Sequence, residues 1–318
     1  MSTATNRTEG KEPSGVLIVN KPSGITSHDV VGITRRLFGT RRVGHAGTLD
    51  PLASGVLVVL VGRAAKAAEY LSASSKTYRA LLRLGLTTDT EDITGQVQTT
   101  CADLPDSATV IRACHAFTGE ILQIPPMYSA LKVQGKKLVD LARRGIEVER
   151  SARPVTLFSL TCSPTDIPSD YLLEVVCSGG TYIRTLCADI GKSLGCGGVM
   201  AALERTSACG FSLAQAKTPE ELDGLSLQER QALLIPVASL FSDLPSIRLP
   251  EFYERLCRNG CEIYQKKIGT AWPVGQRVQL WGKNGFFAVG EILPPEACKE
   301  PEKGSAVKAL KLFDLNEA

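Results

Sequence analysis

The chain has 318 residues, of which 43% are hydrophobic and 22% are charged, a composition typical of a water-soluble globular protein. Its length allows one large domain with a smaller second domain. No apolar run approaches the roughly 20 residues that cross a bilayer, and the polar first residues lack the apolar segment of a secretory signal. The sequence therefore predicts a cytoplasmic protein that does not span a membrane.

Ten cysteines and three histidines are scattered along the chain. The cysteines are too dilute for a disulfide framework, and no Cys-x-x-Cys pair is present to start a zinc site. We expect free thiols that are buried as small apolar side chains. The sequence predicts chemistry without a metal ion.

The positive charge is concentrated near the N-terminus. Between Lys21 and Arg83 there are ten Lys or Arg residues and three acidic ones, so this segment carries +7 and the rest of the chain −4. Such an excess favours a polyanionic partner such as a nucleic acid. A solvated basic surface without a ligand explains it equally well.

The first elements surround an irregular segment. A short apolar run at 15–21 ends in Lys-Pro-Ser-Gly and predicts a buried strand followed by a turn. Ser27 is suited to cap a helix that ends near Gly39. Residues 41–55 carry three glycines and a proline and predict a loop without secondary structure, and loops of that length are usually functional or disordered.

A second group of elements begins with the strand 76–86, where Tyr78, Ala80 and Leu82 alternate with Thr77, Arg79 and Arg83. This alternation predicts a half-buried strand with one basic face. The remaining pattern predicts helices at 106–117, 138–144 and from 181 onward, and strands at 154–162, 171–177 and 199–213.

The pattern changes after residue 217. Residues 217–240 are helical and acidic, and after Pro245 short apolar runs alternate with glycines and prolines, which indicates a small β-rich module. The predicted fold class is α+β, with a mixed, largely antiparallel sheet and flanking helices. We divide the chain into a flexible tail (1–14), a main α+β domain (15–240) and the β-rich module (245–318).

Asp50 lies in the glycine-rich segment Gly-His-Ala-Gly-Thr-Leu-Asp-Pro, inside the basic region. Pro51 disfavours a helical conformation at Asp50. Taken alone, Asp50 could be an ordinary solvated loop residue. A phosphate-binding loop would need a Gly-rich motif that is missing here, and glycoside hydrolysis normally needs a second carboxylate. A single carboxylate suits nucleophilic attack that forms a covalent intermediate and then reverses.

Five motifs occur in an order that closely resembles the bacterial tRNA pseudouridine synthase B family. They are GVLIVNKPSGITSHDVV, VGHAGTLDPLASGVLVV, KTYRALLRLGLTTDTEDITG, QIPPMYSALKVQGKKLVDLARRG and CSGGTYIRTLCADIG, and the resemblance runs from about Gly15 to Phe211. It implies the pseudouridine synthase fold and isomerisation of a T-loop uridine, at tRNA position 55, without a cofactor. The module 245–318 resembles the PUA RNA-binding domain that many members carry.

The resemblance also implies roles for particular residues. The family's catalytic aspartate falls on Asp50, and an arginine beside it falls on Arg184, which we expect to keep Asp50 ionised. The tyrosine that stacks on the target uracil, and is implicated in moving a proton, falls on Tyr78. The remaining matched positions are His45, which would occupy the space of the everted base, Tyr182 and Leu203 beside the pocket, and Lys21, part of a Lys-Pro pair under the active-site loop.

The expected mechanism starts when the protein grips the T arm of tRNA by shape and phosphate contacts and extrudes one uridine. Asp50 then attacks, and the uracil turns and rejoins through C5. We expect a monomer. Two alternatives remain at the level of sequence: an RNA-binding factor without activity, and a related synthase that works within a guide-RNA particle.

Overall fold

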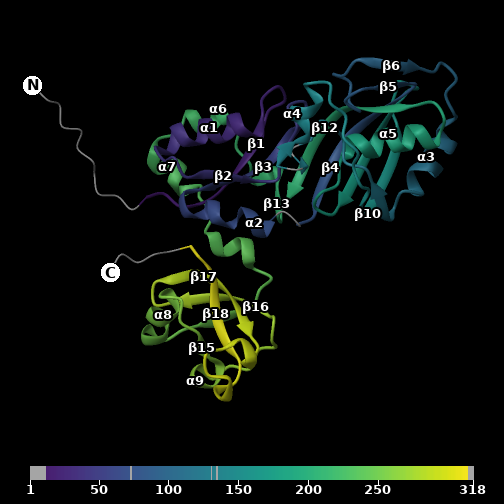
Figure 1. The fold of residues 1–318 in the computed structure, drawn as a ribbon. Helices are drawn as coiled ribbons and strands as arrows, with labels where there is room; N and C mark the ends of the chain where they lie inside the picture. Colours follow the sequence, from purple (N-terminus) through teal and green to yellow (C-terminus); the bar gives the residue numbers. More distant parts are fainter. Residues whose placement is uncertain (1–11, 72–73, 130, 134, 314–318) are drawn as a thin grey trace, which may run out of the picture.

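The computed structural model describes residues 12–71, 74–129, 131–133 and 135–313. Figure 1 shows a long domain built around a large sheet, and a smaller domain that follows it in the chain, coloured green to yellow. Most of the predicted tail lies outside the described residues. At its end, Glu12 forms an ion pair with Arg42 (3.0 Å) and accepts a hydrogen bond from Thr40, so this part packs against the long domain.

In the described part of the chain, the long domain holds a nine-stranded sheet in the order β1-β3-β12-β4-β11-β10-β7, with β2 paired to β3 and β13 to β12. All of these described pairs are antiparallel except β12 with β3. The predicted mixed, largely antiparallel sheet is confirmed. Its strands are β1 (Gly15–Lys21), β2 (Val43–Ala46), β3 (Ser54–Val61), β4 (Lys76–Leu84), β7 (Gly119–Gln123), β10 (Arg153–Pro164), β11 (Asp170–Cys177), β12 (Gly198–Ala208) and β13 (Phe211–Ser212).

Helices flank this sheet (Figure 1). One group packs near β1 and β3, where α1 contacts α6 and α7, and a second group, α3 and α5, packs against β10 and β12. The α-helices are α1 (Ser27–Phe38), α2 (Ala68–Leu71), α3 (Ser107–His115), α4 (Leu138–Ala142), α5 (Ile183–Ser193), α6 (Pro219–Asp223) and α7 (Leu227–Ala232), and the short 3-10 helices are Gly62–Ala67, Leu213–Gln215 and Val237–Phe241. Two small hairpins, β5 (Leu86–Thr88) with β6 (Val97–Thr100) and β8 (Lys132–Val133) with β9 (Lys136–Lys137), extend from the long domain.

Helix α1 starts one residue earlier than predicted, with Thr26 as its cap. The Thr26 side chain accepts from the backbone of Asp29, and the Asp29 carboxylate accepts from the backbone of Thr26, which completes a capping box. Gly39 ends the helix in the left-handed conformation (φ 62°). The Ser27 hydroxyl, predicted to cap the helix, instead exchanges hydrogen bonds with the backbone of Leu49 (2.8 and 3.0 Å).

The segment 41–55, predicted to be entirely irregular, contains strand β2. Val43–Ala46 pairs antiparallel with β3, in register His45↔Val59. The prediction was wrong here because β2 is only four residues long and contains a glycine and a histidine, so its pattern is weak. Val43 and Ala46 are buried. The irregular parts are therefore residues 41–42 and the turn between Ala46 and Ser54, which carries Asp50.

Strand β4 alternates as predicted, with the Tyr78 side of the strand buried. Its basic face, however, is neutralised by acids on β11. Arg79 pairs with Glu174 (3.1 Å), and Arg83 pairs with Asp170 (2.6 Å). The local charge of +7 therefore overstates the positive charge that β4 could offer a polyanion, since sequence position does not reveal cross-strand partners.

The smaller domain is a five-stranded sheet in the order β14-β16-β17-β18-β15 with its own core. Its elements are β14 (Ser246–Arg248), α8 (Glu251–Arg258), β15 (Ile263–Tyr264), α9 (Gln265–Ile268), β16 (Arg277–Gly282), β17 (Gly285–Leu293), β18 (Ala306–Leu312) and the 3-10 turns Pro295–Ala297 and Pro301–Lys303. Phe241, Phe286 and Phe313 stack together where it meets the long domain. Lys66 also donates to the Leu312 carbonyl (3.1 Å).

The contact between β3 and β12 requires a glycine at its centre. Gly55 has φ +104°, and a Cβ there would lie 2.3 Å from the Arg205 carbonyl oxygen and 2.8 Å from its nitrogen. Backbone atoms of a central strand cannot move away cheaply, so only glycine permits this approach. The turn that carries Asp50 therefore leads directly into a tight backbone contact with β12.

We expect Gly55→Ala to lower the free energy of unfolding by more than the roughly 1–3 kcal/mol that backbone strain alone costs, because the clash with Arg205 adds to it. Gly210→Ala is the matched control, since Gly210 also has positive φ (+79°) but faces open space. Urea unfolding of both variants measures the difference. Equal losses would show that β12 can shift to admit a methyl group.

Candidate active site

Asp50 and Arg184 form an ion pair that connects the turn between β2 and β3 to the first turn of α5. The Arg184 Nε lies 2.9 Å from Asp50 Oδ2, and its Nη2 lies 3.3 Å from Oδ1, so both carboxylate oxygens are engaged. The two side chains differ in exposure: 5% for Arg184 and 36% for Asp50. The arginine is fixed inside the protein, while the carboxylate remains open to a ligand.

Two further acceptors hold Arg184 in place. Its Nη1 donates to the Thr90 carbonyl (3.1 Å), and its Nη2 donates to the Tyr128 carbonyl (2.8 Å). Because Arg184 stands in the first turn of α5, the helix, the β5–β6 turn and the segment before β8 all converge on Asp50. The sequence indicated Arg184 but not Thr90 or Tyr128, since a main-chain acceptor leaves no signal in residue type.

The turn that carries Asp50 is bonded to the segment after β1. Lys21 is fully buried and donates to the carbonyls of Pro22 (2.9 Å), Ile25 (2.8 Å) and Pro51 (3.4 Å). Burial lowers the pKa of Lys21 to about 8, and the charge of Asp50 acts in the opposite direction. Lys21 therefore supports the Asp50 turn, with its ammonium group inside the protein and bonded to main-chain carbonyls.

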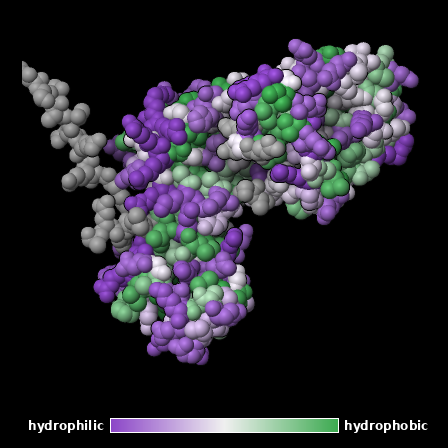
Figure 2. Space-filling view, in the orientation of Figure 1, coloured by the Kyte–Doolittle hydropathy of each residue, from purple (hydrophilic) through white to green (hydrophobic). Residues whose placement is uncertain are grey.

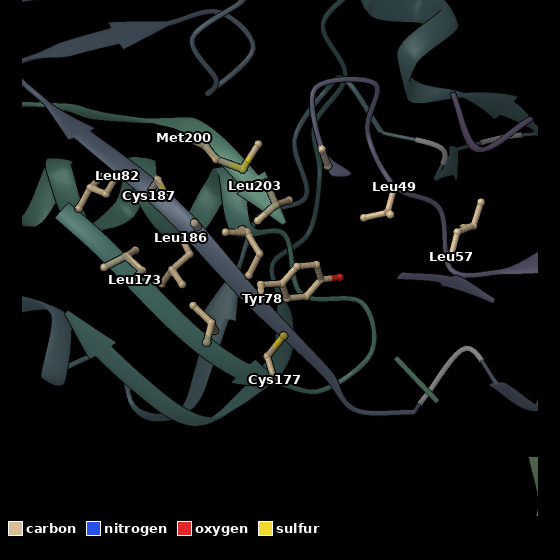
Figure 3. Close-up of a cluster of buried hydrophobic side chains, with 14 of the residues drawn as sticks. Leu49, Leu57, Tyr78, Leu82, Leu173, Cys177, Leu186, Cys187, Met200 and Leu203 are labelled. Atoms are coloured by element: carbon tan, nitrogen blue, oxygen red, sulfur yellow. The ribbon is translucent and has the colours of Figure 1, made fainter. Parts of the chain in front are cut away.

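Tyr78 and Leu203 form an apolar wall beside this turn. Tyr78 is 6% exposed and Leu203 8% exposed, and both belong to the main core. Figure 3 shows Tyr78 extending from β4 with its hydroxyl toward the turn that carries Leu49, and Leu203 beside it on β12. Burial raises the pKa of Tyr78, so the phenol keeps its proton at neutral pH.

Tyr182 precedes α5 and is held by Gln123 of β7. Its backbone nitrogen donates to Gln123 Oε1 (3.0 Å), and its carbonyl accepts from Gln123 Nε2 (3.2 Å). Burial raises the pKa of Tyr182, while the charges of Arg153 and Arg184 act in the opposite direction. A hollow of about 210 Å³ adjoins it, lined by Gln123, Pro125, Leu131, Arg153, Pro154, Val155, Gly179, Gly180 and Tyr182.

His45 lies on β2, the strand that precedes the Asp50 turn. Its Nδ1 is buried and has no hydrogen-bond partner in the described structure. Burial lowers the pKa of His45, and the charges of Arg205 and His28 lower it further. The imidazole is therefore neutral at pH 7.

Arg205 is a residue that the sequence did not single out. It lies on β12, two residues after Leu203 and on the same face, and its side chain is fully buried. It donates to the carbonyls of Gly47 (3.0 Å) and Val56 (2.7 Å), on either side of Asp50. The alternation of β12 could have indicated an inward-facing arginine, but the strand reads as irregular because it contains two bulges.

The site thus presents one accessible carboxylate, paired with a buried arginine and flanked by a buried aromatic ring. No set of three or more His, Cys, Asp or Glu side chains in the described ranges is placed to bind a metal ion. A larger hollow of about 480 Å³ lies at the far end of α5, between Ala113 and Ser193, and none of the predicted site residues lines it. Helices long and apolar enough to cross a membrane are absent from the described residues.

Two protein-family models and several named proteins match this chain. The model of the TruB family pseudouridylate synthase N-terminal domain matches residues 35–183, and that of the tRNA pseudouridylate synthase B C-terminal domain matches residues 184–242. A protein named tRNA pseudouridine synthase B from Syntrophotalea carbinolica is 47% identical over 287 residues, which cover 89% of this chain and 94% of that protein. One from Neisseria meningitidis serogroup A is 37% identical and covers 98% of both chains.

Among solved structures, a chain in the crystal structure of a Cbf5-Nop10-Gar1 complex has a similar fold. The TM-score is 0.70 at 26% identity, over 94% of this chain and 85% of that chain. A chain of an archaeal box H/ACA sRNP Nop10-Cbf5 complex aligns with a TM-score of 0.68 at 25% identity, over 96% and 88% of the two chains.

We expect the protein to lose stability as the pH falls below 6.5 because of His45. Its folded pKa lies below the ordinary value of 6.5, so the unfolded chain binds more protons in the window just below 6.5 and unfolding becomes easier there. The free energy of unfolding, measured from pH 5 to 8, should fall more steeply in the wild type than in His45→Gln. His115→Gln, on an exposed histidine of α3, is the control for histidine removal. Parallel curves for wild type and His45→Gln would contradict the burial of a neutral imidazole.

Proposed function

Because this chain belongs to the TruB family of pseudouridylate synthases, we propose that it isomerises a uridine in the T loop of tRNA, at position 55, to pseudouridine. The observation that carries the proposal is the accessible carboxylate of Asp50, held by the buried Arg184. Relatives named tRNA pseudouridine synthase B over nearly the whole chain support tRNA as the substrate.

Asp50 is the proposed nucleophile. Isomerisation breaks the bond between C1′ and N1 of uridine and forms one between C1′ and C5, while C5 releases its hydrogen and N1 gains one. A carboxylate that attacks and later leaves satisfies this balance without a second acid. Because Arg184 engages both oxygens, it presents the Asp50 carboxylate in one orientation and pairs with its charge.

Tyr78, Leu203 and Tyr182 are the proposed walls of the uracil pocket. An aromatic face holds an extruded base by stacking worth roughly 1–3 kcal/mol, and the Leu203 side chain packs against the same space. A neutral phenol at Tyr78 can donate a hydrogen bond to the uracil while the resting apolar pocket holds no charge. If it transfers its proton, the Tyr78 oxygen becomes a phenolate that needs stabilisation. We assign Lys21 the task of keeping the Asp50 turn rigid.

His45 is the proposed filler of the space that the extruded base leaves. A neutral imidazole suits a stack of bases, since burying a charge there would be costly. Extrusion itself costs a few kcal/mol, which stacking on Tyr78 offsets.

The tRNA backbone requires exposed cations, and β4 offers few of them. The exposed arginines Arg35, Arg36, Arg41 and Arg42 lie at the end of α1 and just after it, where Figure 2 shows a predominantly hydrophilic surface. Two of them form surface ion pairs, Arg36 with Asp223 and Arg42 with Glu12, which a phosphate would have to displace. We propose that this surface and the small β-rich domain, which we interpret as PUA-like, contact the RNA by phosphate and shape recognition. The proposed enzyme works in the cytoplasm as a monomer, without a metal ion or other cofactor.

We expect Asp50→Asn to abolish turnover while leaving tRNA binding within about threefold of wild type, because binding rests on many phosphate contacts. Release of tritium from C5-labelled uridine in a T-loop transcript measures turnover, and filter binding measures affinity. Asp166→Asn, on an exposed loop, is the matched control. Wild-type tritium release by Asp50→Asn would refute the nucleophile, and binding without release by the wild type would favour a non-enzymatic RNA-binding factor.

A T-arm hairpin alone should be a substrate, and isomerisation should fall on position 55. Recognition of local shape needs no guide strand, which separates this proposal from a synthase that works within a guide-RNA particle. The measurement is site-resolved mapping of pseudouridine in the hairpin and in intact tRNA after incubation with the purified protein. Activity that appears only when a guide RNA is added would contradict it.

A further inference from the structure

Arg205 is a buried guanidinium without a carboxylate partner. It is the largest of the fully buried side chains, and it forms no ion pair within the described residues. Its Nε donates to the Val56 carbonyl (2.7 Å) and its Nη2 to the Gly47 carbonyl (3.0 Å). Its Nη1 is buried and has no hydrogen-bond partner in the described structure. A buried, unpaired cation with a spare donor is costly, which points to a role beyond packing.

The register of the sheet places Arg205 beside Tyr78. The two residues are directly opposite each other in the antiparallel pair of β12 with β4, and both side chains face the buried side. Directly opposed residues on one face have Cβ atoms roughly 4.5–5.5 Å apart. A guanidinium can only donate, so it accommodates the phenol oxygen as an acceptor and leaves the phenolic proton to point elsewhere.

The electrostatics agree with this placement. Burial raises the pKa of Tyr78, whereas the positive charge of Arg205 is the strongest influence in the opposite direction. The other groups that act on the Tyr78 hydroxyl are Cys177 on β11 and Asp50 on its turn, and both raise its pKa. Arg205 is thus the group that favours negative charge on the Tyr78 oxygen.

Arg205 also frames the nucleophile. Gly47 precedes Asp50 and Val56 follows it, and Arg205 donates to the carbonyls of both. At Gly47 the fit is close, since a Cβ there would lie 3.4 Å from Arg205 Nη1. Arg205 therefore bonds both ends of the Asp50 turn to β12, the strand that pairs with the Tyr78 strand β4.

We propose that Arg205 is a positioning residue for the isomerisation, which fixes the turn of Asp50 and stabilises the Tyr78 oxygen as negative charge develops on it. This inference rests on the proposed function, in which Tyr78 exchanges a proton at the uracil. The phenol gives its proton to N1 when the bond between C1′ and N1 breaks, and it takes a proton back from C5 after the bond between C1′ and C5 forms. In between, Arg205 Nη1, which has no partner in the resting structure, donates a hydrogen bond to the phenolate oxygen.

The first test is a double-mutant cycle between Arg205→Met and Tyr78→Phe, measured as single-turnover rates on T-loop tRNA with excess enzyme. We expect Arg205→Met to reduce the rate about 10²-fold, as for loss of one donor to a developing charge, with tRNA affinity within about threefold. In the Tyr78→Phe background the same change should cost much less, because residues that act together are not additive. Losses that multiply would overturn the coupling.

The matched control is Arg79→Met. Arg79 lies on β4 next to Tyr78, but its side chain is on the opposite face and pairs with Glu174 at the surface. Its removal should leave both the rate and the cycle unchanged. If Arg205→Met fails to fold, Arg205→Lys enters the same cycle: a lysine retains the charge but cannot reach both carbonyls, so it should recover part of the coupling to Tyr78.

A second measurement needs no RNA and therefore separates this inference from the proposed function. Ultraviolet titration of tyrosine ionisation, taken as the difference between each protein and its Tyr78→Phe counterpart, isolates Tyr78. We expect its ionisation to move to higher pH in Arg205→Met and less so in Arg205→Lys, because loss of a cation disfavours the phenolate. An unchanged titration would refute the contact between Arg205 and Tyr78 even if the enzyme is active.

Discussion

The ion pair between Asp50 and Arg184 is the interaction on which the site depends. Its two partners lie far apart in the sequence, and their side chains differ in burial, 36% exposed against 5%. A buried arginine needs acceptors on all sides, and the carbonyls of Thr90 and Tyr128 provide them. The pair therefore draws together α5, the turn after β5 and the segment before β8, and it leaves only the carboxylate open.

A few side chains also hold the turn that carries Asp50. Buried donors reach it from two sides, Lys21 from the end of β1 and Arg205 from β12, while Ser27 bonds to Leu49 within it. These contacts are between side chains and main-chain groups, so they fix the backbone and leave the Asp50 carboxylate free of them. The proposed role of Asp50 as a nucleophile would gain from such rigidity, because the reacting geometry must be in place before the substrate arrives.

The structure changes the interpretation of the basic segment that pointed to a polyanionic partner. The excess of basic residues between Lys21 and Arg83 favoured a polyanionic partner, but in the structure Arg79 and Arg83 pair with acids of β11, and Lys21 is inside the protein. Exposed cations remain at Lys66 and Arg79 and around the end of α1. The net charge of a segment does not reveal ion-pair partners on a distant strand. Arg79, for example, pairs with Glu174, which lies 95 residues later in the chain.

The residue pattern alone predicts the alternating strand of Tyr78, a helix around Ile183, the β-rich end of the chain and, through the ordered motifs, the family. These features depend on local periodicity and on residue identity, which a linear pattern records. Three further features became visible only in the three-dimensional structure. They are strand β2 within the Asp50 segment, the three carbonyls around Lys21 and the place of Arg205 opposite Tyr78. They depend on strand register and on main-chain acceptors, and neither is encoded by the type of any single residue.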